Sequence, residues 1–268
     1  MDEKQTVRRW SLVLVVVLAV LTGLVGLWLL AIPAEEIKDE TWERIQREGV
    51  LRVGTDASYP PFEDIDDLGN LMGYDIELAQ ELGRRFGVEV EFVVISFDGL
   101  YDALRVARID IIVSALPLDP RLTEDVTYSY PYFNAGQVLA VRDDEEGILG
   151  VNDLAGRSVG VELGSMGDVE ARQLLRKMQF ELIPYRTPEE ALSMLKTRQV
   201  DVTIMDIVST YQFMREQGGV KIAGPPVRDD PYVMATSPKS PVLQERVNQA
   251  ILDLSARGFL DQLRMKWF

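Results

Sequence analysis

Apolar positions along the chain follow two different periods from residue 50 onward. Short runs rich in Val and Ile are typical of buried strands. They cover Val50–Gly54, Val88–Ile95 and Ile109–Ser114. Between them, Asp75–Phe86 and Asp98–Ala107 repeat their apolar residues at the spacing of one helix face. Gly87 suits the left-handed residue that ends a helix, so this stretch predicts alternating strands and helices.

A second series of the same kind begins after residue 157. Its expected strands and helices are Ser158–Val161, Asp168–Met178, Thr187 to about Arg198, and Val200–Met205. Thr187-Pro188-Glu189-Glu190 is a capping box with Pro at the first helical position. Ser240-Pro241 begins the last long helix, and Gly258 ends it. Strand–helix–strand alternation is typical of parallel sheets, so two series predict an α/β protein of two lobes.

The N-terminal segment has a different pattern. Ser11–Ile32 contains no charged residue, and about 20 apolar residues cross a bilayer as a helix. Arg8 and Arg9 precede the run, while acidic residues follow it, which places the N-terminus inside. We therefore expect a cytoplasmic end at 1–9, a transmembrane anchor at 10–32 and a linker at 33–41. The alternative is a cleaved signal peptide, whose apolar region is usually only about 7–15 residues long.

Composition excludes several classes of chemistry. The 268 residues include no Cys and no His, which excludes disulfides, thiol and Ser-His nucleophiles and His-ligated metals. The formal net charge is −15, which disfavours nucleic acid as a partner. No motif indicates a metal site or a cofactor. Carboxylates number 43, so acid–base chemistry is the one catalytic route left open.

One segment carries a familiar motif, the run Val53-Gly54-Thr55-Asp56-Ala57-Ser58-Tyr59-Pro60-Pro61-Phe62-Glu63. It resembles the opening motif of the family 3 extracellular solute-binding proteins, the amino-acid receptors of bacterial ABC importers. Further stretches match that family in the same order. They are Gly73–Ile76, Phe97–Leu100, Tyr128–Tyr132, Leu154–Val161, Val200–Asp206 and Lys266–Phe268. The resemblance covers about residues 42–268.

The resemblance implies a two-lobed periplasmic-binding-protein fold of type II, joined by two crossover strands. The first lobe is then expected at 42–136 and 228–268, and the second at 137–227. In this family a small solute binds between the lobes and favours their closure, and an ABC permease in the membrane receives it. The implied protein is an extracytoplasmic, anchored monomer that binds a polar amino acid or a related small amine.

The resemblance also assigns ligand contacts. Asp206, after a buried strand, matches the family carboxylate that pairs with the ligand ammonium. Tyr59 and Phe97 match the aromatic residues that sandwich the ligand side chain. Asp56 beside them suits a basic ligand end. Each has a structural alternative, which is a helix N-cap for Asp206, core packing for the two aromatic rings and a turn for Asp56.

The carboxylate clamp of the family is altered in the run Ser114–Leu122. Pro117 stands where relatives have a hydroxyl, and it has no N–H to donate. Leu122 occupies the place of the clamping arginine, and Arg121 lies one residue early. Two alternatives follow: either Arg121 takes over the clamp, or the ligand is not an ordinary α-amino acid.

Four more residues complete the expected site. Ser114 and Ala115 begin the altered run. Ser165 and Met166 lie in the Gly164–Gly167 turn of the second lobe, where backbone N–H groups at a helix start can bind an anion.

Two other functions stay open. A sensor or partner module would need a separate signalling protein, because few residues precede the apolar run. A dehydratase would use a cleft carboxylate, with Asp206, Asp56 or Glu162 as its acid. We expect a binding protein rather than an enzyme, with no catalytic residue.

Overall fold

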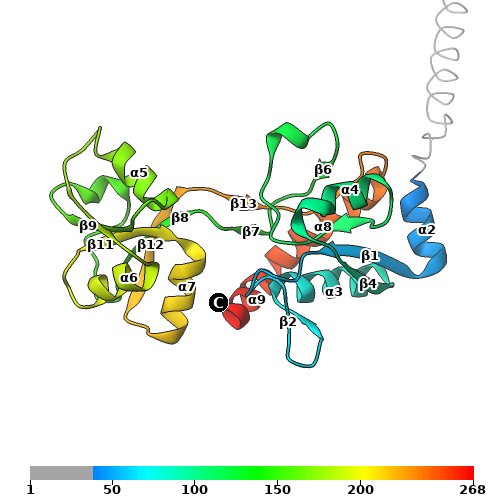
Figure 1. Ribbon diagram of the computed structural model, residues 1–268, viewed down its shortest axis with the longest axis horizontal. Coiled ribbons are helices and arrows are strands. Elements are labelled where there is room, and N and C mark those ends of the chain that lie inside the picture. The colour runs from blue at the N-terminus through cyan, green and yellow to red at the C-terminus, as the bar shows by residue number, and fades with distance from the viewer. Residues whose placement is uncertain (1–38) are drawn as a thin grey trace, which may run out of the picture. The chain divides into compact units, whose positions relative to one another are not determined.

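The computed structural model describes residues 39–268, which form two α/β lobes (Figure 1). The expected two-lobed α/β architecture is therefore confirmed. The anchor expected at 10–32 lies outside the described residues. Among the residues that are described, no helix is long and apolar enough to cross a membrane.

The first lobe is built on a five-stranded sheet in the order β4-β1-β5-β14-β6. Strand β1 runs parallel to β4 and β5, while β14 is antiparallel to β5 and β6. The strands are β1 (Val50–Thr55), β4 (Glu89–Val94), β5 (Ile111–Ile112), β6 (Thr127–Tyr128) and β14 (Ala235–Thr236). The helices are α2 (Glu40–Glu48), α3 (Tyr74–Phe86), α4 (Leu100–Arg105), α8 (Pro241–Ala256) and α9 (Phe259–Trp267).

The second lobe has its own five-stranded sheet, in the order β10-β9-β11-β8-β12. Strand β9 is parallel to β10 and β11, and β8 is antiparallel to β11 and β12. The strands are β8 (Gln137–Arg142), β9 (Ser158–Glu162), β10 (Glu181–Tyr185), β11 (Val202–Asp206) and β12 (Val220–Arg228). The helices are α5 (Met166–Leu174), α6 (Pro188–Lys196) and α7 (Ile207–Glu216).

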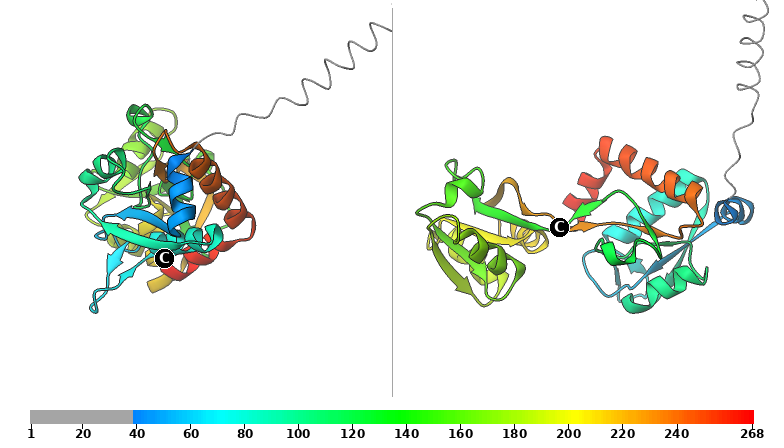
Figure 2. Two further views of the ribbon diagram at one scale, coloured as in Figure 1. Left: turned by 90° about the vertical axis from the view of Figure 1, so that its right-hand side faces the viewer. Right: turned by 90° about the horizontal axis from the view of Figure 1, so that it is seen from above.

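Two extended segments join the lobes, as Figure 2 shows. The chain enters the second lobe through β7 (Phe133–Asn134) and leaves it through β13 (Pro231–Tyr232). These two short strands pair antiparallel with each other. A further hairpin, β2 (Asp64–Ile65) with β3 (Leu71–Met72), lies between β1 and α3.

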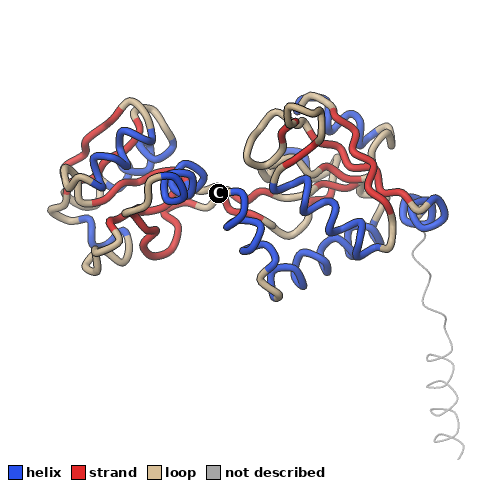
Figure 3. The backbone as a smooth tube through the Cα atoms, turned by 90° about the horizontal axis from the view of Figure 1, so that it is seen from below, coloured by secondary structure: helices blue, strands red, loops and turns tan. Residues whose placement is uncertain are grey.

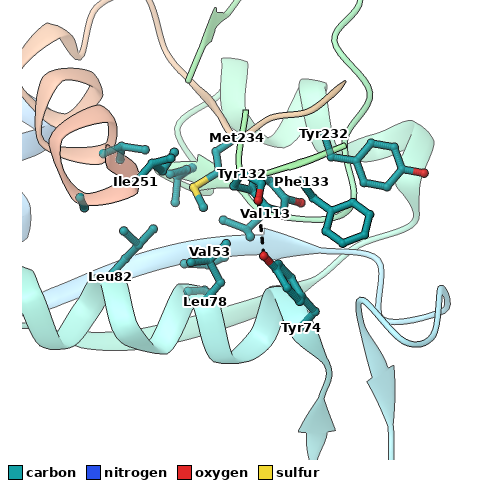
Figure 4. Close-up of a cluster of buried hydrophobic side chains, with 14 of the residues drawn as sticks. Val53, Tyr74, Leu78, Leu82, Val113, Tyr132, Phe133, Tyr232, Met234 and Ile251 are labelled. Carbon is teal, nitrogen blue, oxygen red and sulfur yellow. Dashed lines mark hydrogen bonds between the residues drawn. The ribbon is translucent and has the colours of Figure 1, made fainter. Parts of the chain in front are cut away.

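Helices lie beside the sheet strands in both lobes (Figure 3), and buried side chains lie on both faces of the first sheet. Neighbouring residues of a strand point to opposite faces. Ile111 accordingly joins the cluster beneath α3 and α8, whereas Ile112 joins the cluster beneath α4. Figure 4 shows the first of these clusters, in which Val53, Leu78 and Ile251 come from β1, α3 and α8.

Four helix ends show how individual residues set the bounds of the elements. Gly87 ends α3 at φ 70°, as its position predicts. Thr187 caps α6 by accepting a hydrogen bond from the N–H of Glu190 at 3.2 Å. The Glu190 carboxylate accepts from the N–H of Arg186, one residue before the cap. The side chain of Ser240 makes no cap bond to α8. Asp39 caps this helix instead, because its carboxylate accepts from two N–H groups at the start of α8. The same carboxylate also accepts from the N–H of Trp42 in α2.

Some expected boundaries were wrong. The segment Asp98–Ala107 is a 3-10 turn at Phe97–Gly99 followed by α4, and the strand expected at Ile109–Ser114 is only β5. Helix α5 begins at Met166 rather than Asp168, because Ser165 caps it. The pattern also did not predict α9, which starts after Gly258 breaks α8 at φ 71°.

Candidate functional site

The segment after β1 folds back on itself and holds an aromatic ring at the surface. The N–H of Tyr59 donates to the carbonyl of Glu63 at 2.9 Å, and the N–H of Glu63 donates to the carbonyl of Tyr59 at 3.1 Å. Phe62 between them is fully buried and packs on Phe133, Tyr232 and Phe268. The Tyr59 ring stacks on Phe62 at 5.6 Å and is still 46% exposed. The core thus fixes an aromatic face that solvent or a ligand can reach.

A cavity of about 280 Å³ lies beside this ring, at the carboxyl ends of β1 and β5. Ligands in open α/β sheets bind at this end of the strands. Phe97, 39% exposed, supplies a second aromatic ring. The cavity is lined by Asp56, Ser58, Tyr59, Glu63, Phe97, Ser114, Ala115, Pro117 and Tyr232. Six of the ten residues expected at the site are therefore brought together here.

Ser114 connects the backbone of Asp56 to the carboxyl group of Glu63. Its Oγ accepts a hydrogen bond from the N–H of Asp56 at 3.0 Å. The same hydroxyl donates to Oε1 of Glu63 at 2.7 Å. The Asp56 carboxylate accepts from the hydroxyl of Ser58 at 2.5 Å. Ser114 is buried, and both of its hydrogen-bonding roles are filled by the protein.

A buried acid pair, Glu63 with Asp75, lies against the cavity. Gly73 brings the two together: at φ 133° it lets α3 begin against the Tyr59–Glu63 turn, where a Cβ would lie 2.1 Å from the carbonyl oxygen of Phe62. Asp75 accepts hydrogen bonds from the N–H of Ala115 at 2.5 Å and the hydroxyl of Tyr132 at 2.8 Å. Figure 4 shows Tyr132 facing Tyr74, whose hydroxyl donates to the Tyr132 carbonyl.

The surroundings of this pair favour a bound proton. Within the described residues, Oε2 of Glu63 and Oδ1 of Asp75 are buried without another partner. Burial, and then the charge of Asp75, raise the pKa of Glu63. Burial also raises the pKa of Asp75. The hydrogen bonds that its carboxylate accepts act in the opposite direction and have the smaller effect. One proton between the two carboxyls satisfies both oxygens and leaves the pair with one negative charge.

Backbone contacts hold the altered run, Ser114–Leu122, against the segment that returns from the second lobe. Pro117 bridges to Tyr232, the N–H of Leu118 donates to the carbonyl of Pro231, and the carbonyl of Leu116 accepts from the N–H of Val233. These contacts fix which residues of the run reach the cavity.

Arg121 does not line the cavity. It lies in the short 3-10 turn Pro120–Leu122, which Asp119 caps. Its guanidinium is bound to the Asp119 carboxylate, with Nε–Oδ1 at 2.9 Å and Nη2–Oδ2 at 2.6 Å, and its side chain is 86% exposed. This ion pair lowers the pKa of Asp119 to about 2. Leu122, at the place of the family arginine, packs against the α4 core cluster.

The three expected residues of the second lobe lie at helix starts after parallel strands. Ser165 caps α5 by accepting from the N–H of Asp168 at 3.2 Å. Met166 is the first residue of α5, and its sulfur accepts from Nη1 of Arg228 at 3.2 Å. Asp206 caps α7, with Oδ1 accepting from the N–H of Ser209 at 2.8 Å.

Glu162 ends β9 in the same lobe. Burial, and then the charge of Asp206, raise the pKa of Glu162.

Sequence reasoning missed Glu63, Ser58, Tyr232 and Asp75 as parts of the site. Glu63 and Ser58 stand inside the opening motif, so the motif itself was the available signal. Tyr232 reaches the cavity from the return segment, far along the chain, and no local pattern marks it.

Comparison with known proteins finds one protein family that the chain matches. The sequence model of a family described as bacterial extracellular solute-binding proteins, family 3, matches residues 51–268. The arginine-binding extracellular protein ArtP of Bacillus subtilis is 28% identical over 220 residues, which is 81% of this chain and 86% of that protein.

Two solved structures are similar as well. An ancestral cationic amino acid solute binding protein is 32% identical with a TM-score of 0.62, over 85% of this chain and 100% of that one. An ancestral cyclohexadienyl dehydratase is 25% identical with a TM-score of 0.76, over 87% and 98% of the two chains.

Proposed function

We propose, on the premise that this chain belongs to the bacterial extracellular solute-binding proteins of family 3, that it is the extracytoplasmic substrate-binding component of an ABC importer. It captures a polar amino acid or a related small amine by closing its two lobes over the molecule. The relative from Bacillus subtilis is named for arginine binding, and a similar structure for binding cationic amino acids. Both names agree with a cationic solute.

The observation that supports this proposal best is the cavity on the first lobe. Tyr59 and Phe97 offer partly exposed aromatic faces, and Asp56 offers a carboxylate beside them. Aromatic faces and carboxylates together attract ammonium and guanidinium groups. A cavity of about 280 Å³ suits a molecule of amino-acid size.

A thermal-shift panel of amino acids and amines tests the binding function. A ligand at about 100 times its Kd is expected to stabilise the folded protein by about 2.7 kcal/mol. Phe97→Ala should reduce that shift, while Leu252→Ala, an exposed residue of α8 outside the cavity, serves as the matched control. A broad panel without any shift would contradict the proposal.

Closure is tested with a pair of fluorophores. The chain has no cysteine, so two introduced cysteines label uniquely. Leu68 in the β2–β3 hairpin and Leu149 in the second lobe are both exposed and serve as sites. The transfer efficiency between the dyes should change on ligand addition and stay constant in the Phe97→Ala variant. A ligand that binds without any change would contradict closure.

The segment 10–32 is proposed to anchor the protein on the outer face of the cell membrane. Membrane fractions should retain the full chain after carbonate washing, with the body accessible to external protease. A mature protein that begins near Glu35 would instead indicate a cleaved signal peptide.

A dehydratase is the second candidate function, favoured by the structural similarity to an ancestral cyclohexadienyl dehydratase. Glu63 adds a carboxyl group beside the cavity whose pKa is raised by burial, which favours the protonated form that a general acid needs. Incubation with a cyclohexadienyl acid, followed by the ultraviolet absorbance of an aromatic product, tests this function. Turnover that Glu63→Gln abolishes would replace the transport proposal with an enzymatic one.

A further inference from the structure

The cavity on the first lobe carries negative charge and no balancing cation. Asp56 and Glu63 are the acidic residues that line it, the fully buried Asp75 lies behind Glu63, and neither Lys nor Arg is among the lining residues. A ligand carboxylate placed there would face carboxylates at short range. Attraction or repulsion between unit charges a few ångströms apart is large where water is partly excluded.

Two hydrogen-bond donors at the start of the altered run are already in use. The hydroxyl of Ser114 donates to Glu63, and the N–H of Ala115 donates to Asp75. Pro117 has no N–H. The Ser114 hydroxyl and the Ala115 N–H therefore serve the acid pair rather than a ligand carboxylate.

The arginine nearest in sequence to the family clamp already has an ion-pair partner. The guanidinium of Arg121 is bound in two-point contact with Asp119, and the side chain points to solvent. Leu122, at the clamp position itself, is partly buried and packs against the core cluster beneath α4. A shift of one residue that brought Arg121 inward would pull Leu122 out of that cluster.

The second lobe also offers carboxylates. Asp206 uses Oδ1 to cap α7, and Oδ2 has no hydrogen-bond partner in the described part of the chain. Glu162 at the end of β9 lies near enough for the charge of Asp206 to raise its pKa. Arg228, the basic residue next to Met166, is paired with Glu170 at 3.0 Å.

We infer that the ligand is a small dication without a carboxylate, such as an alkyl diamine or a guanidino-amine, rather than an α-amino acid. This inference rests on the proposed binding function and narrows its substrate class. One cationic end lies between Tyr59 and Phe97 beside Asp56, and the other pairs with Asp206. The aliphatic chain between them covers the apolar part of the cavity.

Matched pairs of compounds test the inference directly. L-arginine with agmatine, L-lysine with cadaverine, and L-ornithine with putrescine differ only in the α-carboxylate. Calorimetric titration of the purified protein should show the decarboxylated member of at least one pair binding about tenfold tighter or more, a gap of about 1.4 kcal/mol. Equal or tighter binding of the amino acid in each pair that binds would overturn the inference.

The outcomes separate this inference from the proposed function. If none of the six compounds binds but another amino acid from the thermal-shift panel does, the binding function stands and the dication inference fails. If nothing in the panel binds, both fail. Asp56→Asn keeps the shape of its side chain and should weaken diamine binding about tenfold or more, which is one lost charge-assisted contact. Asp67→Asn, in the exposed β2–β3 turn, is the matched control and should leave it unchanged.

Discussion

Replacing Glu63 with Gln is expected to flatten the pH dependence of folding stability. Glu63 is 1% exposed, and burial beside Asp75 raises its pKa to about 9. In the unfolded chain a glutamate titrates near pH 4.3. Between these values the folded protein holds a proton that the unfolded chain has released, so stability falls as pH rises through this window and is not lost on acidification.

The size of the effect follows from the number of protons. One extra proton bound by the folded state lowers the free energy of unfolding by about 1.4 kcal/mol for each pH unit. From pH 6 to pH 8 the wild-type protein should therefore lose about 3 kcal/mol from this pair. A domain of this size changes its Tm by about 2–4 °C per kcal/mol, which predicts a fall of roughly 6–12 °C.

Glutamine at position 63 copies the protonated state of the carboxyl. Its amide oxygen accepts from Ser114 as Oε1 of Glu63 does, and its amide nitrogen donates to Asp75. The variant takes up no proton at this position. It should match the wild type near pH 5 and become the more stable protein by about 3 kcal/mol over the next two pH units.

Urea denaturation at pH 5, 6, 7, 8 and 9 measures these free energies, with ligand absent. Subtracting the two curves removes the contribution of all other carboxylates. Glu89→Gln, on the exposed edge of β4, is the matched control and should keep the wild-type slope. A Glu63→Gln protein with the wild-type slope would show that the pair holds no proton in the folded state.

Three further substitutions separate stability from binding. Asp39→Ala removes the side-chain cap of both α2 and α8 and should cost about 2 kcal/mol in urea denaturation, at about 1 kcal/mol per cap; a change below about 0.5 kcal/mol would contradict that role. Arg121→Ala should alter the ligand Kd less than about twofold and leave the urea midpoint nearly unchanged, because its ion pair is exposed; a tenfold loss of affinity would restore Arg121 as a clamp. Asp206→Asn should keep the cap of α7 and its Tm but weaken amine binding in calorimetry, and unchanged affinity would leave Asp206 with a structural role alone.

Patterns of local residues predicted most of the framework. Strand β1, strand β4 and helix α3 were expected within a residue or two, because a buried strand or helix needs apolar residues at its own period. The cap at Thr187 and the left-handed Gly87 were also predicted, since each depends on contacts within four residues. Family resemblance then named six residues that the fold brings to one cavity.

Contacts between distant segments could not be predicted in this way. Asp39 caps α8 across 203 residues, which displaced the expected role of Ser240. Arg121 pairs with Asp119 because Asp119 caps the same short turn and stands only two residues away. The family pattern does not predict this ion pair. The acid pair forms only because Gly73 lets α3 begin against the turn at Glu63, so neither carboxylate is marked by its own neighbours.

Asp206 shows why a structural and a functional interpretation of one residue need not compete. A carboxylate that follows a buried parallel strand stands at the start of the next helix, where N–H groups require an acceptor. The same position is the sheet edge at which α/β proteins bind their ligands. Asp206 has two oxygens, and the cap uses only Oδ1. The cap holds the side chain in one orientation, so Oδ2 needs little further ordering to accept from an ammonium group, and less of the contact energy is lost to side-chain entropy.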